Sequence, residues 1–277
     1  MMRQIVSAAG GLWLGLAGAA LAQTGPAPDM GAAAVAPPGR AVAEAPPVPG
    51  AKPARDSDTP PMPVTASEQG VVVELYTSQG CSSCPPADAL MEELVTQPGV
   101  IALALHVDYW DYIGWKDTFA NPRFTDRQKA YARAEGSRMI YTPQMIVGGR
   151  ERIVGHEPGQ LSDALRRRMP PKSPVRLTVE RQGDMVIIRA EADPPLSRGV
   201  RVQLVRYQPQ QTVEIMGGEN AGQIVTYSNI VTDWQVVGEW PGTAPLELQA
   251  PAPGAAPVVV ILQNEGPADI VAAAALR

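Results

Sequence analysis

The sequence of 277 residues contains only two cysteines and two histidines. Two cysteines cannot build the dense disulfide framework of a small secreted scaffold, and the sequence lacks the second cysteine pair or histidine-rich tract of a zinc module. Positive charge is also scarce, because 23 Lys and Arg residues stand against 28 Asp and Glu residues. The formal net charge of -5 gives no basic footprint for nucleic acid or acidic lipid, so we expect neither partner.

Long apolar runs are almost absent. At the amino terminus, Arg3 precedes the mostly apolar and small residues 5–21, and Ala20-Leu21-Ala22 has the small-x-small form of a signal-peptidase site. No later stretch reaches the roughly 20 consecutive apolar residues of a spanning helix. We expect residues 1–22 to be a signal peptide cleaved near Ala22. The mature protein would be exported, periplasmic or extracellular, with no membrane span, in a compartment where disulfides persist.

Residues 23–68 are rich in Ala and Pro and almost free of aromatic and long aliphatic side chains. Such a segment cannot bury enough apolar surface to offset the entropy lost on ordering. We expect a disordered linker here, followed by two domains, residues 69–171 and residues 172–277.

The two cysteines stand three positions apart in Cys81-Ser82-Ser83-Cys84, directly after the mostly apolar run 71–76. A strand that delivers a Cys-x-x-Cys pair is typical of thiol-disulfide chemistry. One alternative is a static disulfide, although so small a loop contributes roughly 2 kcal/mol against about 3 kcal/mol for a 15-residue loop. Another is a Cu(I) site that adds His106 or His156 to the cysteines. We expect no metal.

Strand and helix patterns alternate along residues 69–171. The expected elements are a strand at 71–76, a helix at 87–95, a strand at 100–107, a helix starting at Asn121 or Thr125, a hairpin of 144–147 and 151–154, and a helix at 157–169. A right-handed crossover makes the first two strands parallel, so the segments that follow them share one edge of the sheet. If the third strand is antiparallel, Thr142-Pro143 returns to the same edge. The expected fold is an α/β domain with the cysteines at that edge.

Three motifs carry a resemblance to a known family. They are Cys81-Ser82-Ser83-Cys84-Pro85-Pro86-Ala87-Asp88, His106-Val107-Asp108-Tyr109-Trp110-Asp111 and Tyr141-Thr142-Pro143-Gln144. Together they resemble secreted bacterial thioredoxin-like proteins of unassigned function, over residues 69–171. The resemblance implies a thioredoxin-like fold in which Cys81 attacks and Cys84 resolves the mixed disulfide. It also implies that Pro143 is a cis-proline facing the disulfide and that Thr142 binds the substrate backbone.

Three polar residues are candidates for a proton relay. Glu74 is the acid available on the first strand, and its alternative roles are to cap a strand end or to pair with a nearby base. His106 stands at the end of the second strand, where its alternative is a hydrogen-bonded structural role. Asp108 follows that strand, and it either tunes thiol protonation or satisfies backbone donors. Pro85 and Pro86 each disfavour helical geometry in the preceding residue. We therefore expect the first helix to start near Pro86 and to act less strongly on Cys81.

Aromatic residues gather in the loop after the second strand. These side chains either form a groove for an extended partner or pack the loop onto the domain. They are Tyr109, Trp110, Tyr112 and Trp115. We take Tyr109 and Trp110 as candidate substrate-binding residues. The basic run that follows is expected to be the solvated face of a helix; it consists of Arg123, Arg127, Lys129 and Arg133.

Residues 172–277 contain no cysteine and no histidine. About seven short alternating segments divided by Gly and Pro predict a small all-β, sandwich-like domain. The glycine-rich residues 217–222 lack the following helix and Lys-Ser/Thr of a phosphate loop. They are expected to be a turn or bulge, or a loop that contacts the other domain.

The sequence thus predicts an exported thioredoxin-like protein, a thiol-disulfide oxidoreductase that exchanges disulfides through Cys81 and Cys84. The partners would be protein thiols or disulfides, or a small thiol, and we expect no cofactor. The alternatives are a non-catalytic binding module with a static disulfide and Cu(I) handling. Neither the direction of exchange nor the oligomeric state follows from the sequence.

Overall fold

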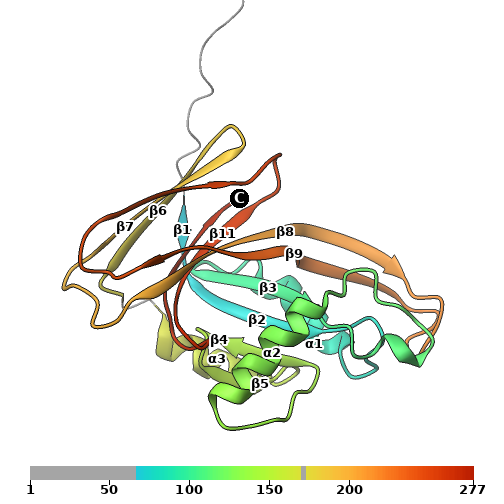
Figure 1. Ribbon diagram of the computed structural model, residues 1–277. Coiled ribbons are helices and arrows are strands. Elements are labelled where there is room, and N and C mark those ends of the chain that lie inside the picture. Colours follow the sequence, from blue (N-terminus) through green and yellow to red (C-terminus); the bar gives the residue numbers. More distant parts are fainter. Residues whose placement is uncertain (1–66, 170–172) are drawn as a thin grey trace, which may run out of the picture. The chain divides into compact units, whose positions relative to one another are not determined.

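The computed structural model describes residues 67–169 and 173–277 (Figure 1). They form a mixed α/β structure dominated by strands, with one sheet of nine strands, a second of three, and three α-helices. The predicted signal peptide and residues 23–66 of the predicted linker lie outside the described residues. None of the helices in the described ranges is long and apolar enough to cross a membrane.

The first half of the described chain follows the expected order of elements. These are β2 (Val71–Thr77), α1 (Pro85–Leu94), β3 (Val100–His106), η1 (Asp111–Ile113), α2 (Pro122–Ala134), β4 (Gln144–Val147), β5 (Glu151–Val154) and α3 (Pro158–Arg168). β2 and β3 are parallel, β4 runs antiparallel to β2, and β4 and β5 form a hairpin. The predictions for these strands and for the parallel direction of β2 and β3 are confirmed. The antiparallel direction of β4 meets the condition under which Thr142-Pro143 returns to the edge that carries the cysteines.

Helices on both faces of the sheet explain why β2 is almost wholly apolar. All seven of its residues are buried. Val73 and Leu75 pack with α1 and α3, whereas Val72 and Tyr76 pack with α2. Because neighbouring strand residues point to opposite faces, a strand covered on both sides needs apolar residues throughout.

Proline marks the start of α1 and α2. α2 begins at Pro122, and the side chain of Asn121 accepts a hydrogen bond of 3.0 Å from the Arg123 amide. α1 begins at Pro85, one residue before the predicted start near Pro86, with Cys84 at the position that precedes the helix. A proline fits the first helical position because the amide that it lacks would have no intrahelical acceptor there.

The second half of the chain forms strands alone, and they divide between the two sheets. The remaining elements are β1 (Glu68–Gln69), β6 (Val175–Gln182), β7 (Met185–Ala192), β8 (Val200–Glu214), β9 (Ile224–Trp240), β10 (Leu246–Pro251), β11 (Val258–Asn264) and β12 (Ile270–Leu276). β10, β7 and β6 make the small sheet, and the large sheet has the order β1-β12-β11-β8-β9-β3-β2-β4-β5. Apolar side chains of the two sheets pack together in one core.

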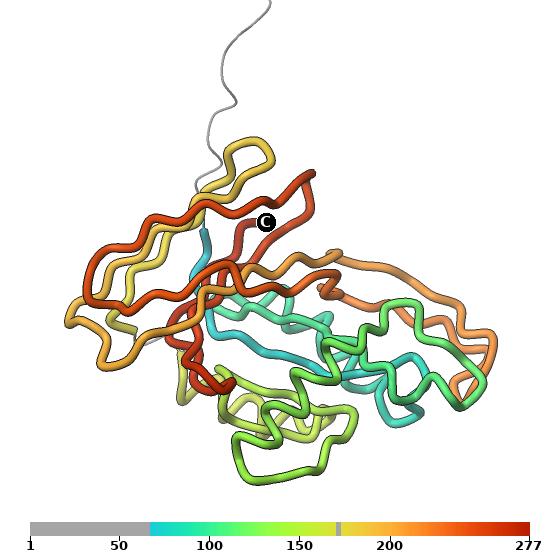
Figure 2. The backbone as a smooth tube through the Cα atoms, viewed as in Figure 1, coloured from blue at the N-terminus to red at the C-terminus, as the bar shows by residue number. Residues whose placement is uncertain are grey.

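The large sheet continues across the expected domain boundary at residue 171. β9 lies beside β3, with Ala104 opposite Ile230 in a parallel pair (Figure 2). Asn229 adopts a positive φ of 47°, and its side-chain amide donates to the Ala102 carbonyl at 2.8 Å. Asn tolerates this backbone region better than most residues. The predicted sandwich-like half therefore shares a sheet with the predicted thioredoxin-like half.

A contact beside a buried ion pair also joins the two halves. Arg127 on α2 donates to both carboxylate oxygens of Glu74 at 2.7 and 2.9 Å, and its guanidinium carbon lies 3.8 Å from the centre of a Trp234 ring. Burial acts to lower the pKa of Arg127, but the Glu74 carboxylate together with Tyr131 and Tyr76 outweighs it, and the pKa is raised. Arg127 is therefore not part of a solvated helix face, and that prediction was wrong for this residue.

Candidate functional site

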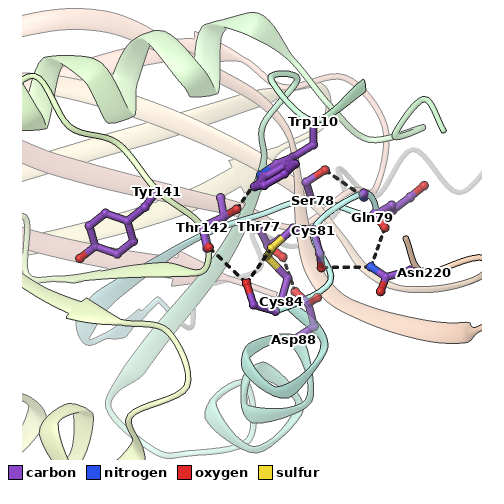
Figure 3. Close-up of a disulfide and its surroundings, with 12 residues drawn as sticks. Thr77, Ser78, Gln79, Cys81, Cys84, Asp88, Trp110, Tyr141, Thr142 and Asn220 are labelled. Carbon is purple, nitrogen blue, oxygen red and sulfur yellow. Dashed lines mark hydrogen bonds between the residues drawn. A yellow bond between two sulfur atoms is a disulfide. The ribbon is translucent and has the colours of Figure 1, made fainter. Parts of the chain in front are cut away.

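Cys81 and Cys84 form a disulfide between the end of β2 and the start of α1 (Figure 3). Their Cα atoms are 5.4 Å apart. The Cys81 amide donates to the Ser78 carbonyl and the Cys84 amide donates to the Cys81 carbonyl, each at 3.1 Å. The disulfide loop is therefore a tight turn leading into the helix.

The Thr142-Pro143 segment lies against this disulfide. Its peptide bond is cis. The Thr142 carbonyl lies 3.5 Å from the Ser83 hydroxyl, which in turn lies 3.4 Å from the Cys81 sulfur. Gly155 lies between Pro143 and the start of α1, where there is no room for a side chain. A Cβ at Gly155 would be 2.7 Å from the Pro143 Cβ and 3.1 Å from the Ala87 Cβ. The structure thus brings Thr142 and Pro143 to the cysteines.

Trp110 closes the same region from the loop after β3. Its indole N–H donates to the Thr142 hydroxyl at 2.7 Å (Figure 3). A Cβ at Gly80 would lie 3.2 Å from the Trp110 Cβ, so the indole-bearing loop rests directly on the disulfide loop. Both cysteines are 0% exposed, whereas Ser82 and Ser83 are exposed. A partner that reaches the Cys81 sulfur must therefore displace covering side chains.

Asp88 places a buried carboxyl group beneath the disulfide (Figure 3). It follows Cys84 by one helical turn, and its amide donates to the Cys84 carbonyl at 3.1 Å. One carboxyl oxygen accepts from the Thr77 hydroxyl at 2.8 Å, and the other has no hydrogen-bond partner within the described residues. Burial raises the pKa of Asp88 to about 7, against an opposing effect of His106.

Sequence reasoning missed Asp88 and proposed Glu74 instead. The side chain of Glu74 lies on the α2 face of β2, opposite the face that packs on α1, and it binds Arg127. The alternative role that pairs Glu74 with a nearby base therefore matches the structure. The signal for Asp88 was present: it falls on the α1 face that also buries Ala87 and Met91, where a carboxyl group is out of place.

His106 is buried within a ring of polar and aromatic contacts. Its Nδ1 lies 2.7 Å from a carboxylate oxygen of Asp117, which also accepts from the Gln79 amide at 2.8 Å. Burial acts to raise the pKa of Asp117, yet His106 and the hydrogen bonds outweigh it and the pKa is lowered. An ionised Asp117 can only accept, so Nδ1 carries the proton. Nε2 has no hydrogen-bond partner among the described residues.

The remaining predicted site residues bind α2. The hydroxyl of Thr125 donates to the Asp108 carboxylate at 2.6 Å, and the Tyr109 hydroxyl donates to the Gln128 side chain at 3.2 Å. Burial raises the pKa of Tyr109 to about 12. These contacts pack the aromatic loop onto the domain, as one of the two interpretations of that loop expected. In the described ranges, no group of three His, Cys, Asp or Glu side chains is placed to hold a metal ion.

Comparisons with known proteins match most of the chain. A family model described as "Protein of unknown function (DUF1223)" matches residues 72–263. A crystal structure of a protein from Agrobacterium tumefaciens is 35% identical, with a TM-score of 0.64, and the match covers 74% of this chain and 93% of that one. HBP35 of Porphyromonas gingivalis is 12% identical, with a TM-score of 0.54 and 76% of each chain covered, so it is similar in fold alone. Comparison with curated proteins finds no match.

Proposed function

Because this chain belongs to the family of unknown function DUF1223, its activity has to be inferred from the site, and we propose that it exchanges disulfides through Cys81 and Cys84. The observation that carries the proposal is the disulfide at the start of α1, with Thr142-Pro143 on one side and the buried Asp88 carboxyl on the other. Protein thiols or disulfides, or a small thiol, would be the partners.

The order of elements around the site supports a thioredoxin-like relation for residues 69–171. The parallel pair of β2 and β3, the antiparallel hairpin of β4 and β5, and the closing helix α3 follow the order that the resemblance implies. The cysteines and Thr142-Pro143 then fall at one edge of the sheet. Ligands of open α/β sheets bind at that kind of edge.

In the reducing direction, the Cys81 thiolate attacks one sulfur of a substrate disulfide, and the other substrate sulfur leaves as a thiolate. Cys81 and the substrate are then joined by a mixed disulfide. The Cys84 thiol gives its proton to Asp88 and attacks the Cys81 sulfur, which breaks the mixed disulfide and releases the second substrate thiolate. The substrate gains two electrons, and the Cys81–Cys84 pair becomes oxidised. The same steps in reverse oxidise a substrate dithiol.

Asp88 is suited to the proton step. A group with a pKa of about 7 holds both protonation states near neutral pH, which is the condition for efficient acid-base catalysis. Its carboxyl group is one turn from Cys84 and lacks a partner for one oxygen within the described residues. Asp88 therefore takes the role that the sequence had assigned to Glu74.

The proposal places this chemistry outside the cytoplasm. The sequence of residues 1–22 predicts a signal peptide, and disulfides persist in exported proteins. Cu(I) handling remains an alternative that the sequence left open.

A static disulfide in a binding module is the second candidate, and one observation favours it. Both cysteines are 0% exposed beneath Trp110 and Thr142. A shielded disulfide resists attack unless its cover moves. The two candidates differ in what the free Cys81 thiol does once Cys84 is removed.

Trapping with Cys84→Ala tests the proposed exchange. We expect the variant, expressed as the full chain, to accumulate mixed disulfides through Cys81, because the resolving thiol is absent. Non-reducing gels followed by mass spectrometry would detect them. The matched control is Cys81→Ala with Cys84→Ala, which should form none. An absence of mixed disulfides, together with a Cys81 that reacts slowly with alkylating reagents, would establish the static candidate instead.

A further inference from the structure

The long hairpin of β8 and β9 reaches the disulfide loop from the other half of the chain. These strands have 15 and 17 residues, far more than the seven residues of β3. Their far end, residues 215–223, is closed by hydrogen bonds between Ile215 and both Gly222 and Gln223. In Figure 1 the orange end of this hairpin lies beside the loop that contains η1.

Glycines allow the hairpin end to approach that loop closely. A Cβ at Gly217 would lie 2.6 Å from the Gly114 carbonyl oxygen. A Cβ at Gly218 would lie 3.2 Å from the Trp115 Cβ, and this residue has a φ of 73°. A larger residue at either position would push the hairpin away from the site. The glycine-rich segment is therefore the loop contacting the first half of the chain that one interpretation expected.

This close approach places Asn220 against the disulfide loop. Its side-chain amide nitrogen donates to the Gln79 carbonyl at 2.9 Å and to the Cys81 carbonyl at 3.0 Å (Figure 3). Its oxygen accepts from the Gln223 side chain at 3.2 Å. Asn220 is 2% exposed, so these bonds form in a site that excludes water. One side chain thereby fixes both carbonyls that flank Gly80.

The start of α1 offers few donors of its own to the cysteines. Pro85 and Pro86 have no backbone N–H. The next two amides, of Ala87 and Asp88, both donate to the Cys84 carbonyl at 2.8 and 3.1 Å. The amino-terminal end of α1 therefore offers Cys81 few free backbone N–H donors, although such donors ordinarily stabilise a thiolate. The Asn220 amide is a donor that reaches the Cys81 backbone from outside the helix.

We propose that Asn220 is a positioning residue of the redox site, holding the Cys81 backbone and offsetting the partial negative charge of its carbonyl oxygen so that the Cys81 thiolate is favoured. This inference rests on the proposed exchange function. It means that the half of the chain without cysteines tunes the reactivity of the half that carries them.

The experiment measures the pH profile of Cys81 alkylation by iodoacetamide in the Cys84→Ala background, with and without Asn220→Ala. We expect the midpoint of the profile to rise by roughly half a unit to one unit when Asn220 is replaced. The rate below the midpoint should fall roughly threefold to tenfold, the effect of losing a hydrogen bond of ordinary strength. Ala221→Ser, at an exposed position of the same loop, is the control and should leave the profile unchanged.

The outcomes separate this inference from the function on which it rests. If Cys81 reacts readily in the parent and the Asn220→Ala profile coincides with the parent profile, Asn220 does not position the site, although exchange stands. If Cys81 is inert in the folded parent, the exchange function itself fails. Asn220→Ser, whose hydroxyl is too short to bridge both carbonyls, replaces the alanine variant if circular dichroism shows that the latter is unfolded.

Discussion

Replacing Arg127 with methionine should lower the free energy of unfolding by about 3–5 kcal/mol, the usual cost of removing one partner of a buried ion pair. The Glu74 side chain is 0% exposed and the Arg127 side chain is 12% exposed. Without the guanidinium, the Glu74 carboxylate keeps hydrogen bonds from the Tyr131 and Tyr76 hydroxyls at 2.6 and 3.0 Å but loses its counter-charge. Urea denaturation followed by circular dichroism measures the change.

Two further variants identify the cause of that loss. Lys129→Met removes an exposed charge from the same helix, where the ammonium lies 3.9 Å from Asp126, and should change stability by less than about 0.5 kcal/mol. Adding Glu74→Leu to Arg127→Met should restore much of the stability, because no uncompensated charge then remains buried. A loss below about 1 kcal/mol for Arg127→Met alone would show that the ion pair does not join α2 to the sheet as described.

Replacing Asp88 with asparagine should make the protein more stable at pH 8. The pKa of Asp88 is raised in the folded protein to about 7 from 3.8, so the folded state favours the protonated carboxyl group. The protonated Asp88 carboxyl group stabilises the folded state fully at a pH below its pKa in the unfolded chain. This stabilisation is lost as the pH rises from about 4 to about 7. Asparagine does not titrate. We expect a gain on the order of 2–4 kcal/mol at pH 8 and little change at pH 4, since one pKa unit corresponds to about 1.4 kcal/mol.

The same variant should exchange disulfides more slowly. Asparagine cannot accept the proton of Cys84, and a positioned acid-base group typically contributes at least about a hundredfold to rate. Denaturation series at several pH values and the rate of release from the mixed disulfide measure the two effects. Glu92→Gln, at an exposed position of the same helix, is the control. Equal pH dependence of stability in the variant and the parent would contradict the assigned burial of Asp88.

Local patterns were enough to predict the parts of the site that are close in sequence. Cys81 and Cys84 follow an apolar strand, and residues 144–147 and 151–154 read as a hairpin. Parallel pairing of β2 and β3 followed from the crossover rule. These inferences needed only neighbouring residues and general geometry. The place of Thr142-Pro143 depended in addition on an antiparallel third strand, and the cis-proline facing the disulfide was implied by the family resemblance.

The contacts that escaped prediction join residues far apart in the chain. Asn220 is 139 positions from Cys81, and nothing in its own segment shows which backbone it reaches. In the sequence, Arg127 resembles any arginine on a helix surface. Only the folded structure shows that β9 places Trp234 against it. The pair of Ala104 and Ile230 extends one sheet through both halves of the chain. Periodicity reports which face is buried, but it does not identify the segment that covers that face.

The most direct test of the exchange function is the reduction potential of the Cys81–Cys84 disulfide in the full chain. Equilibrating the protein with dithiothreitol or glutathione buffers and counting free thiols gives this value. The proposed function predicts reversible two-electron reduction at a potential between about -270 and -120 mV, the range of thioredoxin-like oxidoreductases. A pair that stays oxidised to below about -300 mV behaves as a structural disulfide, and that result would contradict exchange through Cys81 and Cys84.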